Sequence, residues 1–408
     1  PLLDKKYTYW QSNLIVGSIW GIWHLPLWFI VGESHQGFPF ILFFIYTLFL
    51  SFVLGLLYRQ TKSLGYCIFF HAFANLLNLY FVLKINIIFI ITFIVVSILL
   101  SAGYGVGSYF VNYALSPSSS SDQREIDESD EVQLSDSVQK QIDQNQEKEM
   151  VKGIDFESQT KPMIVSSDDS LNLKGKYLDH ENTHQWVILI HGYKSSNENM
   201  MSYGATYYEH GYNVVLPDNR AHGKSDGEYI GMGWLDKDDI ACWVNWIIEK
   251  DNQAQIILHG VSMGGATVMM ASGDHLPHVV GYIEDCGYTS VWDIFASELD
   301  KRFSLPTFPV LDISNFMAQI RAGYDFKEAS SLEQVKKANA PMLFIHGGKD
   351  DFVPVDMVYE VYDACPTTKE LYIVKEAGHA QAKDYDVEDY WNKVFDFIDQ
   401  NIWKDGTL

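Results

Sequence analysis

The sequence predicts a chain in two parts: a bundle of apolar transmembrane helices, followed by an α/β domain in which helices flank a mostly parallel sheet. Two observations lead to this prediction. Four mostly apolar stretches of about 20 residues fill the first hundred positions, and each is long enough to cross a bilayer. Further along, short apolar runs alternate with helical patterns, as in parallel strands joined by helices.

The four apolar stretches predict a multi-pass membrane domain over residues 1–115. Their near absence of charge argues against a soluble bundle, and four in succession argue against a signal peptide. In an alternating four-span arrangement, lysine and arginine gather on one side in a four-to-one excess, which predicts that this side and the following domain are cytoplasmic. The predicted spans are Asn13–Val31, Phe38–Tyr58, Leu64–Leu83 and Ile85–Tyr104.

Two histidines interrupt these spans. His24 follows Trp20 by four residues, and His71 precedes Asn75 by one helical turn. Ionisable side chains at membrane depth often mark a functional site, and imidazoles from two helices can bind zinc. The W-x-x-x-H and H-x-x-x-N spacings resemble two motifs of the CAAX-type (CPBP) intramembrane metalloproteases. This resemblance implies a zinc site with His24 and His71 among its ligands.

That metalloprotease family also uses an E-E-x-x-x-R motif one span earlier, which this chain lacks. Because the chain begins at Pro1, we interpret residues 1–115 as a fragment whose missing part carried the glutamates. Two alternatives stay open: a degenerate membrane domain kept as an anchor, and a structural role in which the histidines and Asn75 form hydrogen bonds between helices.

The composition of residues 116–150 predicts an acidic, disordered linker. They contain a serine tract and many Asp, Glu and Gln residues but almost no apolar residue, so they cannot bury enough surface to offset the entropy of ordering. The chain has a net charge of −23, most of it after residue 150. This balance argues against nucleic acid as a partner, because phosphate binding requires clustered lysine and arginine. The helices are therefore the expected attachment to the lipid bilayer.

The most informative segment of the α/β domain, predicted over residues 151–408, is the run Gly260-Val261-Ser262-Met263-Gly264. It closes the apolar run Ile256–Leu258 and opens the small-residue run Gly265–Thr267. A serine on such a strand-turn-helix junction projects its hydroxyl above the sheet, and the glycines let strand and helix approach closely. Ser262 is therefore the candidate nucleophile.

Two further segments place an acid and a base at strand ends. Asp350 lies on a turn after the apolar run Met342–Ile345, and His379 follows the strand candidate Glu370–Val374. The chain order is then serine, aspartate, histidine. This order is the one that α/β-hydrolases use, and it differs from the chymotrypsin and subtilisin orders.

From about Gly153 to Trp403 the chain resembles the α/β-hydrolase superfamily, in particular its small-lid esterase, lipase and peptidase-like branch. The turn Asn219–Ser225 supports the resemblance, although relatives more often have glycine at the position of Ala221. The resemblance implies a fold with a mostly parallel sheet, flanking helices and a small cap. The candidate cap is residues 288–326, whose aromatic side chains either form an apolar substrate pocket or pack on the sheet.

The implied mechanism is acyl transfer to Ser262. His379 takes the hydroxyl proton, Asp350 orients the imidazole, and the backbone N–H groups of Tyr193 and Met263 form the oxyanion hole. Competing interpretations exist for several neighbours. Asp351 and Asp285 are alternative acids, and Cys286 is interpreted as a buried thiol. Hydrogen-bonded structural roles are expected for His191, His222, His259 and His346.

The predicted function is a membrane-tethered serine hydrolase that cleaves an ester, thioester or amide. Its substrate would be a small-molecule, lipid or peptide acyl compound, and the hydrolase domain would need no cofactor. The alternative is an intramembrane zinc metallopeptidase fused to an accessory hydrolase domain, with zinc bound in the membrane part of the full-length protein.

Overall fold

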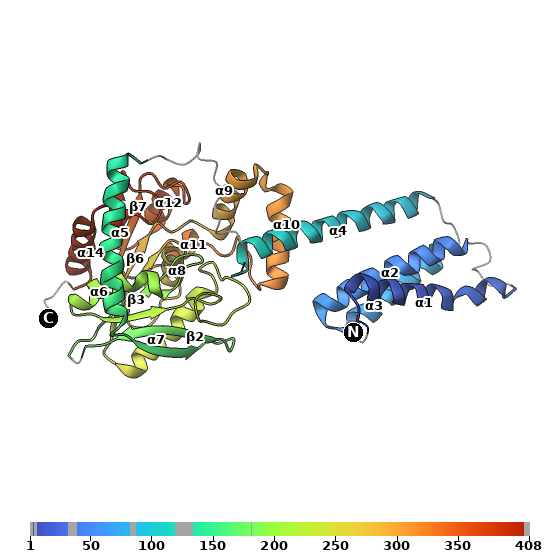
Figure 1. Cartoon of the computed structure of the whole chain (residues 1–408), viewed down its shortest axis with the longest axis horizontal. Coiled ribbons are helices and arrows are strands. Elements are labelled where there is room, and N and C mark those ends of the chain that lie inside the picture. The colour runs from blue at the N-terminus through green and yellow to red at the C-terminus, as the bar shows by residue number, and fades with distance from the viewer. Residues whose placement is uncertain are drawn as a thin grey trace. The chain divides into compact units, whose positions relative to one another are not determined.

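The computed structural model of the chain describes residues 3, 6–31, 39–81, 87–118, 134–180 and 182–403, with side chains described outside 75–81 and 87–90. The chain forms two compact units, residues 1–100 and residues 101–408 (Figure 1). Helix α4 begins in the first unit and ends in the second. Each unit is described separately below.

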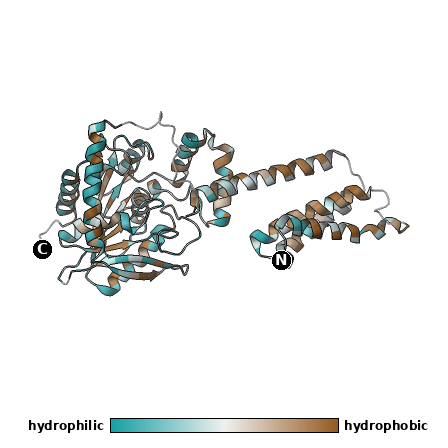
Figure 2. Cartoon of the chain, in the orientation of Figure 1, coloured by the Kyte–Doolittle hydropathy of each residue, from teal (hydrophilic) through white to brown (hydrophobic). Residues whose placement is uncertain are grey.

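The first unit consists of apolar helices. In Figure 2 their ribbons are mostly brown, the colour of hydrophobic residues. A Cβ added to Gly17 would lie 2.8 Å from the Cα of Leu48, so glycine is required where α1 crosses α2. Small residues permit this close approach of apolar helices. The helices are α1 (Tyr9–Trp23), α2 (Phe40–Thr61), α3 (Leu64–Phe81) and the first part of α4 (Ile87–Leu115).

Two described helices are long and apolar enough to cross a membrane: α2, and α4 over residues 91–115. The prediction that Asn13–Val31 forms one continuous helix was wrong. Helix α1 ends at Trp23, and a 3₁₀ turn, η2 (Leu25–Phe29), follows it with Pro26 near its start. Proline lacks the backbone N–H that an α-helix needs, which ends the helix here. The junction between the predicted third and fourth spans lies outside the described residues.

In the second unit, the described strands form one eight-stranded sheet in the order β1-β2-β4-β3-β5-β6-β7-β8 (Figure 1). The pairs β1–β2 and β2–β4 are antiparallel, and all pairs from β4 to β8 are parallel. This confirms the predicted, mostly parallel α/β fold. The strands are β1 (Lys161–Ser166), β2 (Asn172–Leu178), β3 (Gln185–Ile190), β4 (Asn213–Pro217), β5 (Gln255–Val261), β6 (Val279–Asp285), β7 (Met342–Gly347) and β8 (Lys369–Val374).

Both faces of this sheet are covered by helices. Along β3, Val187 and Leu189 belong to one apolar cluster, whereas Trp186, Ile188 and Ile190 belong to the other. Side chains of a strand point alternately to opposite faces, so a strand buried on both faces is apolar throughout. The first face carries α6 (Met201–Glu209) and α14 (Val387–Asn401), and the second carries α7 (Asp236–Lys250), α8 (Met263–Ser272), α11 (Ser331–Val335) and α12 (Asp356–Ala364).

A third apolar cluster lies above the carboxyl ends of the strands. It joins α9 (Val291–Phe303) and α10 (Thr307–Arg321), which occupy the predicted cap segment, to the end of α4. Val111 and Leu115 of α4 are fully buried in this cluster. The compact unit that contains the hydrolase therefore begins near residue 101, earlier than the predicted start at residue 151.

The prediction of a disordered linker over residues 116–150 was wrong for its second part. Residues 136–150 belong to helix α5 (Asp136–Glu157), which is capped by Ser135. Ile142 is fully buried, and Glu149 forms an ion pair of 2.9 Å with the buried Lys383. Composition missed this helix because the apolar surface that orders it belongs to the folded domain. Residues 119–133 lie outside the described residues.

Replacing Ile142 by alanine tests whether α5 is part of the folded domain. We expect the substitution to lower the free energy of unfolding by about 2–4 kcal/mol, because a buried isoleucine loses its apolar contacts. The matched control is Ile154→Ala on the same helix, where the side chain is 58% exposed. The control is expected to change stability by less than about 0.5 kcal/mol. Denaturant unfolding of both variants measures the difference, and equal effects would contradict a docked helix.

Candidate active site

Ser262 occupies a strained turn between β5 and α8. Its backbone has φ +59° and ψ −118°, a conformation that non-glycine residues rarely adopt. The flanking glycines have no room for a side chain: a Cβ on Gly260 would lie 2.1 Å from the carbonyl oxygen of Gly264, and one on Gly264 would lie 2.0 Å from that of Ile190. This close packing makes the serine project from the turn, as the sequence predicts.

The structure brings Ser262 together with the predicted base and acid. Ser262 Oγ lies 2.8 Å from His379 Nε2, and His379 Nδ1 lies 2.8 Å from Asp350 Oδ2. Asp350 lies on the turn after β7, and His379 lies on the loop after β8. Because the parallel strands end at the same edge of the sheet, three segments that are far apart in the sequence meet there.

Asp350 is held as a buried carboxylate. Its Oδ1 accepts hydrogen bonds from the backbone N–H groups of Phe352 and Val353, both at 2.9 Å, and its Oδ2 lies 3.3 Å from His346 Nε2. Burial by itself raises the pKa of Asp350, but the attraction of His379 and the hydrogen bonds from both imidazoles outweigh it, so its pKa lies well below the usual range. The group is therefore ionised at neutral pH.

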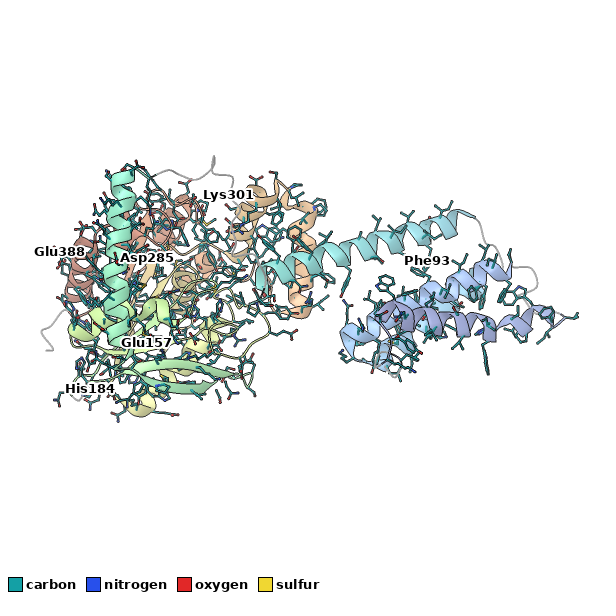
Figure 3. All side chains as sticks on the ribbon, in the orientation of Figure 1. Phe93, Glu157, His184, Asp285, Lys301 and Glu388 are labelled. Atoms are coloured by element: carbon teal, nitrogen blue, oxygen red, sulfur yellow. The ribbon has the colours of Figure 1, made fainter. Side chains whose placement is uncertain are left out.

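Sequence reasoning missed the contact between His346 and the acid. His346 is fully buried at the end of β7, and the attraction of Asp350 raises its pKa although burial opposes this shift. The sequence feature that could have indicated this contact is the four-residue spacing from His346 to Asp350 across the turn. Asp285, one of the two alternative acids, bonds instead to the hydroxyl of Tyr390 at 3.0 Å in the domain interior (Figure 3).

Two histidines hold the turn after β3 in place. The backbone N–H of Lys194 donates to His222 Nε2, and that of Asn219 donates to His191 Nε2, both at 3.0 Å. Burial lowers the pKa of His191 to about 3, which keeps it a neutral acceptor. Both histidines are thus hydrogen-bonded within turns, in agreement with the structural role expected for them. They fix the segment that contains Tyr193.

The backbone around Tyr193 lies next to the nucleophile. A Cβ added to Gly192 would lie only 3.3 Å from the Cβ of Ser262. Met263 is the first residue of α8, where backbone N–H groups have no acceptor within the helix. Both Tyr193 and Met263 line the same pocket as Ser262. The predicted oxyanion residues are therefore gathered at one place.

Ala221, at the position where the family resemblance implies glycine, adopts a φ of +59°. This left-handed conformation favours glycine, because a Cβ makes it unfavourable. The neighbouring Arg220 binds Asp239 through two hydrogen bonds of 2.7 and 2.6 Å. These contacts stabilise the turn around the strained residue.

The described residues of the first unit do not by themselves supply the full ligand set of the zinc site implied by the membrane-domain resemblance. His24 Nδ1 lies 2.8 Å from the carbonyl oxygen of Trp20, and the His71 ring lies 4.9 Å from the ring of Trp20. No aspartate or glutamate lies among the described residues of the first unit. The side chain of Asn75 is outside the described residues. Two imidazoles alone do not make a hydrolytic zinc site, which needs three protein ligands, so we assign no step of the reaction to zinc.

Cys286 lies close to the Asp350–His379 pair, and one ligand atom of each lies within 4.8 Å of the others. Burial raises the pKa of the Cys286 thiol well above its usual range. The imidazole of His379 is already hydrogen-bonded to both Asp350 and Ser262. The geometry thus fits a serine site better than a metal site.

Glu284 is a buried carboxyl that is not part of the Ser262–His379–Asp350 set. It is fully buried at the end of β6, and its Oε2 accepts a hydrogen bond of 2.9 Å from the backbone N–H of Gly287. Burial raises the pKa of Glu284 to about 8. A carboxyl whose pKa is raised by folding stabilises the fold fully below its unfolded pKa. This contribution is lost as the pH rises through its folded pKa.

Glu284→Gln is accordingly expected to change the dependence of stability on pH. The wild-type protein should lose stability relative to the variant between pH 5 and pH 9, by an amount on the order of 4 kcal/mol, because glutamine has no charge to bury. Denaturant unfolding at several pH values measures this loss. The control is Glu388→Gln, at an exposed position (Figure 3), which should follow the wild type. If the difference in free energy of unfolding between the wild type and Glu284→Gln did not change with pH, the raised pKa of Glu284 would be refuted.

Comparison with known proteins identifies the family. The family described as serine aminopeptidase S33, an α/β-hydrolase family, matches residues 181–302. The protein YqkD of Bacillus subtilis is 31% identical over 238 residues, which cover 58% of this chain and 78% of YqkD. The Pyrococcus furiosus esterase Pf2001 has a TM-score of 0.50 and 23% identity over 60% of this chain and 93% of the esterase, a likeness in fold. The chain belongs to the α/β-hydrolase family of enzymes.

The first unit matches a different family. Residues 1–77 match the family described as type II CAAX prenyl endopeptidase Rce1-like. The match to YNL320W of Saccharomyces cerevisiae, a relative described as a membrane protein, is longer than the first unit: it is 22% identical over 258 residues, which cover 60% of this chain and 81% of that protein. Both resemblances that the motifs indicated are therefore confirmed at the level of the family.

Proposed function

We propose that this protein is a membrane-tethered serine hydrolase that cleaves an ester, thioester or amide through an acyl-enzyme. The observation that carries the proposal is the unbroken chain of hydrogen bonds from Ser262 through His379 to the buried Asp350, with 2.8 Å at each step. Nucleophile, base and orienting acid at such distances are the signature of nucleophilic catalysis.

In the proposed reaction, Ser262 Oγ attacks the carbonyl carbon of the substrate while His379 Nε2 takes the hydroxyl proton. Asp350 holds the imidazole with Nε2 toward the serine and stabilises the imidazolium that forms. The N–H groups of Met263 and Tyr193 donate to the oxyanion of the tetrahedral intermediate. His379 then gives its proton to the leaving group.

Water completes the cycle by the reverse path. It attacks the acyl-enzyme, gives a proton to His379 and releases the acid product, and the imidazole returns this proton to Ser262. The reaction as proposed needs no cofactor, and its substrate is a small-molecule, lipid or peptide acyl compound.

The proposed tether is the set of apolar helices in the first unit. Support comes from α2 and α4, two helices long and apolar enough to cross a membrane, and from the Rce1-like match over residues 1–77. The relative YNL320W is itself described as a membrane protein. The excess of lysine and arginine on one side of a four-span arrangement supports a cytoplasmic hydrolase.

Labelling with a fluorophosphonate probe tests the nucleophile directly. The probe reacts with activated serines, so the full chain should be labelled and the Ser262→Ala variant should not. Ser272→Ala is the matched control: this serine is buried in the same helix, and its hydroxyl donates to the carbonyl oxygen of Met269 at 2.7 Å. The control should be labelled like the wild type. Equal labelling of Ser262→Ala would refute the proposed nucleophile.

A further inference from the structure

An apolar pocket lies directly in front of Ser262, and part of its wall comes from α4. The cap helices α9 and α10 contribute mostly aliphatic and aromatic side chains to the pocket, including Phe295 and Phe303. The remaining wall includes Phe110, Tyr113 and Ala114, from the last two turns of α4. A helix that precedes the predicted hydrolase domain in the sequence therefore lines its active site.

The end of α4 is firmly packed in this position. The rings of Phe110 and Tyr113 meet Phe303 of the cap edge to face, at centroid distances of 5.2 and 5.4 Å. A Cβ added to Gly107 would lie 2.5 Å from Met317 Cγ, so the helix approaches α10 as closely as a glycine allows. The backbone carbonyl of Leu115 accepts a hydrogen bond of 2.9 Å from the N–H of Ile230. These contacts make the helix end an ordered wall of the pocket.

The same helix end contacts the turn that carries the proposed oxyanion donor. The hydroxyl of Tyr193 donates to the backbone carbonyl of Ala114 at 2.6 Å. The side chain of Tyr193 is thus held by α4, while its backbone lies beside Ser262. Residues 110–114 consequently define both the shape of the pocket and the position of the turn.

The polar side chains of the pocket, apart from Ser262, already have hydrogen-bond or ion-pair partners within the protein. Glu298 and Arg302 form an ion pair of 2.6 Å, and Arg302 also donates to the hydroxyl of Tyr113 at 3.0 Å. The Ser314 hydroxyl donates to the carbonyl oxygen of Val310 at 2.7 Å. A charged substrate group placed here would be desolvated against apolar side chains, which is costly. A neutral hydrocarbon chain gains free energy from the same burial.

From these contacts we propose that the pocket between α4 and the cap is an acyl-chain site, and that the substrate is a neutral single-chain acyl ester or thioester. Phe110 and Ala114 are the residues of α4 that determine which chain lengths fit. The inference rests on the proposed function of Ser262 as nucleophile. It adds the substrate class, and it assigns part of substrate specificity to the helix whose residues 91–115 form a candidate membrane span.

Chain-length profiles test this assignment. The full chain is reconstituted in lipid nanodiscs, which keep detergent out of the pocket, and hydrolysis of p-nitrophenyl acetate is compared with that of p-nitrophenyl dodecanoate. In Ala114→Phe, the added ring fills the pocket. We expect the ratio of kcat/KM for the dodecanoate to kcat/KM for the acetate to fall at least about tenfold, because a small misfit in an apolar pocket already costs about tenfold.

The matched control is Ala102→Phe, the same exchange on the same helix at an exposed position. It should leave the profile unchanged. A second variant, Phe110→Ala, widens the pocket without adding bulk and should shift the preference toward longer chains. If Ala114→Phe is not labelled by a short fluorophosphonate probe, the variant has lost its reactive serine. The chain-length profile of Phe110→Ala then tests the acyl-chain site.

The outcomes separate the two proposals. If the wild type neither hydrolyses any ester nor reacts with the probe, the function of Ser262 is wrong. If the wild type is active but Ala114→Phe and Phe110→Ala keep its chain-length profile, only the acyl-chain site is wrong. An equal change in Ala102→Phe would also overturn the assignment, because that position does not line the pocket.

Discussion

Ser262→Ala is expected to lower kcat for ester hydrolysis by roughly a million-fold, the effect of removing the nucleophile of a serine hydrolase. The physical reason is that alanine has no hydroxyl to form the acyl-enzyme, so only binding and oxyanion stabilisation remain. Steady-state hydrolysis of a short-chain p-nitrophenyl ester by the full chain measures the loss. Alanine differs from serine by one oxygen atom, so we expect the turn between the flanking glycines to keep its conformation.

Ser272→Ala serves as the control in this assay as well. It removes a buried hydroxyl from the end of α8, the helix that follows Ser262, but leaves the hydrogen bonds from Ser262 to Asp350 intact. Thermal unfolding of both variants separates loss of chemistry from loss of fold. If folded Ser262→Ala kept the wild-type rate, ester cleavage would have to take place elsewhere on the protein.

Asp350→Asn should produce the second largest effect, a fall of roughly ten-thousand-fold in kcat. The asparagine keeps the shape of the side chain but cannot stabilise the imidazolium of His379, and its amide favours the wrong tautomer. The geometry that motivates the test is the 2.8 Å contact from His379 Nδ1 to Asp350 Oδ2. The rate with a short-chain ester, measured at several pH values, gives the magnitude.

Asp351→Asn is the matched control, one residue away in the same turn. The sequence leaves Asp351 open as an alternative acid, whereas the structure places Asp350 against the imidazole. We expect Asp351→Asn to retain activity within about threefold, in the manner of surface substitutions away from the reacting groups. A larger loss in Asp351→Asn than in Asp350→Asn would reverse the assignment of the acid.

The predicted catalytic set could be located from the sequence because its signals are local. Ser262 lies between glycines at a strand-helix junction, and Asp350 and His379 each follow an apolar strand. Parallel strands bring their carboxyl ends to one edge of the sheet, so local signals sufficed to predict a long-range meeting. The contact of His346 with Asp350 was missed, because a buried histidine beside a turn has many possible partners.

The errors in the prediction of boundaries have a common cause. Residues 136–150 are polar enough to suggest a disordered linker, yet Ile142 is buried against the domain. Residues 105–115 fall in the predicted membrane domain, yet Val111 and Leu115 are buried beside the cap. In both cases the partner surface is formed by residues that are distant in the sequence.

By itself, then, the sequence determined the fold class and predicted the candidate serine, acid and base residues, because strand patterns, glycine turns and chain order are properties of short segments. The tertiary structure alone decided that α5 is docked and that Phe110 and Ala114 line the pocket of Ser262. Such contacts depend on which surfaces meet after folding. The free energy that stabilises them comes from apolar surface that both partners bury. The sequence of one segment shows only its own part of that surface.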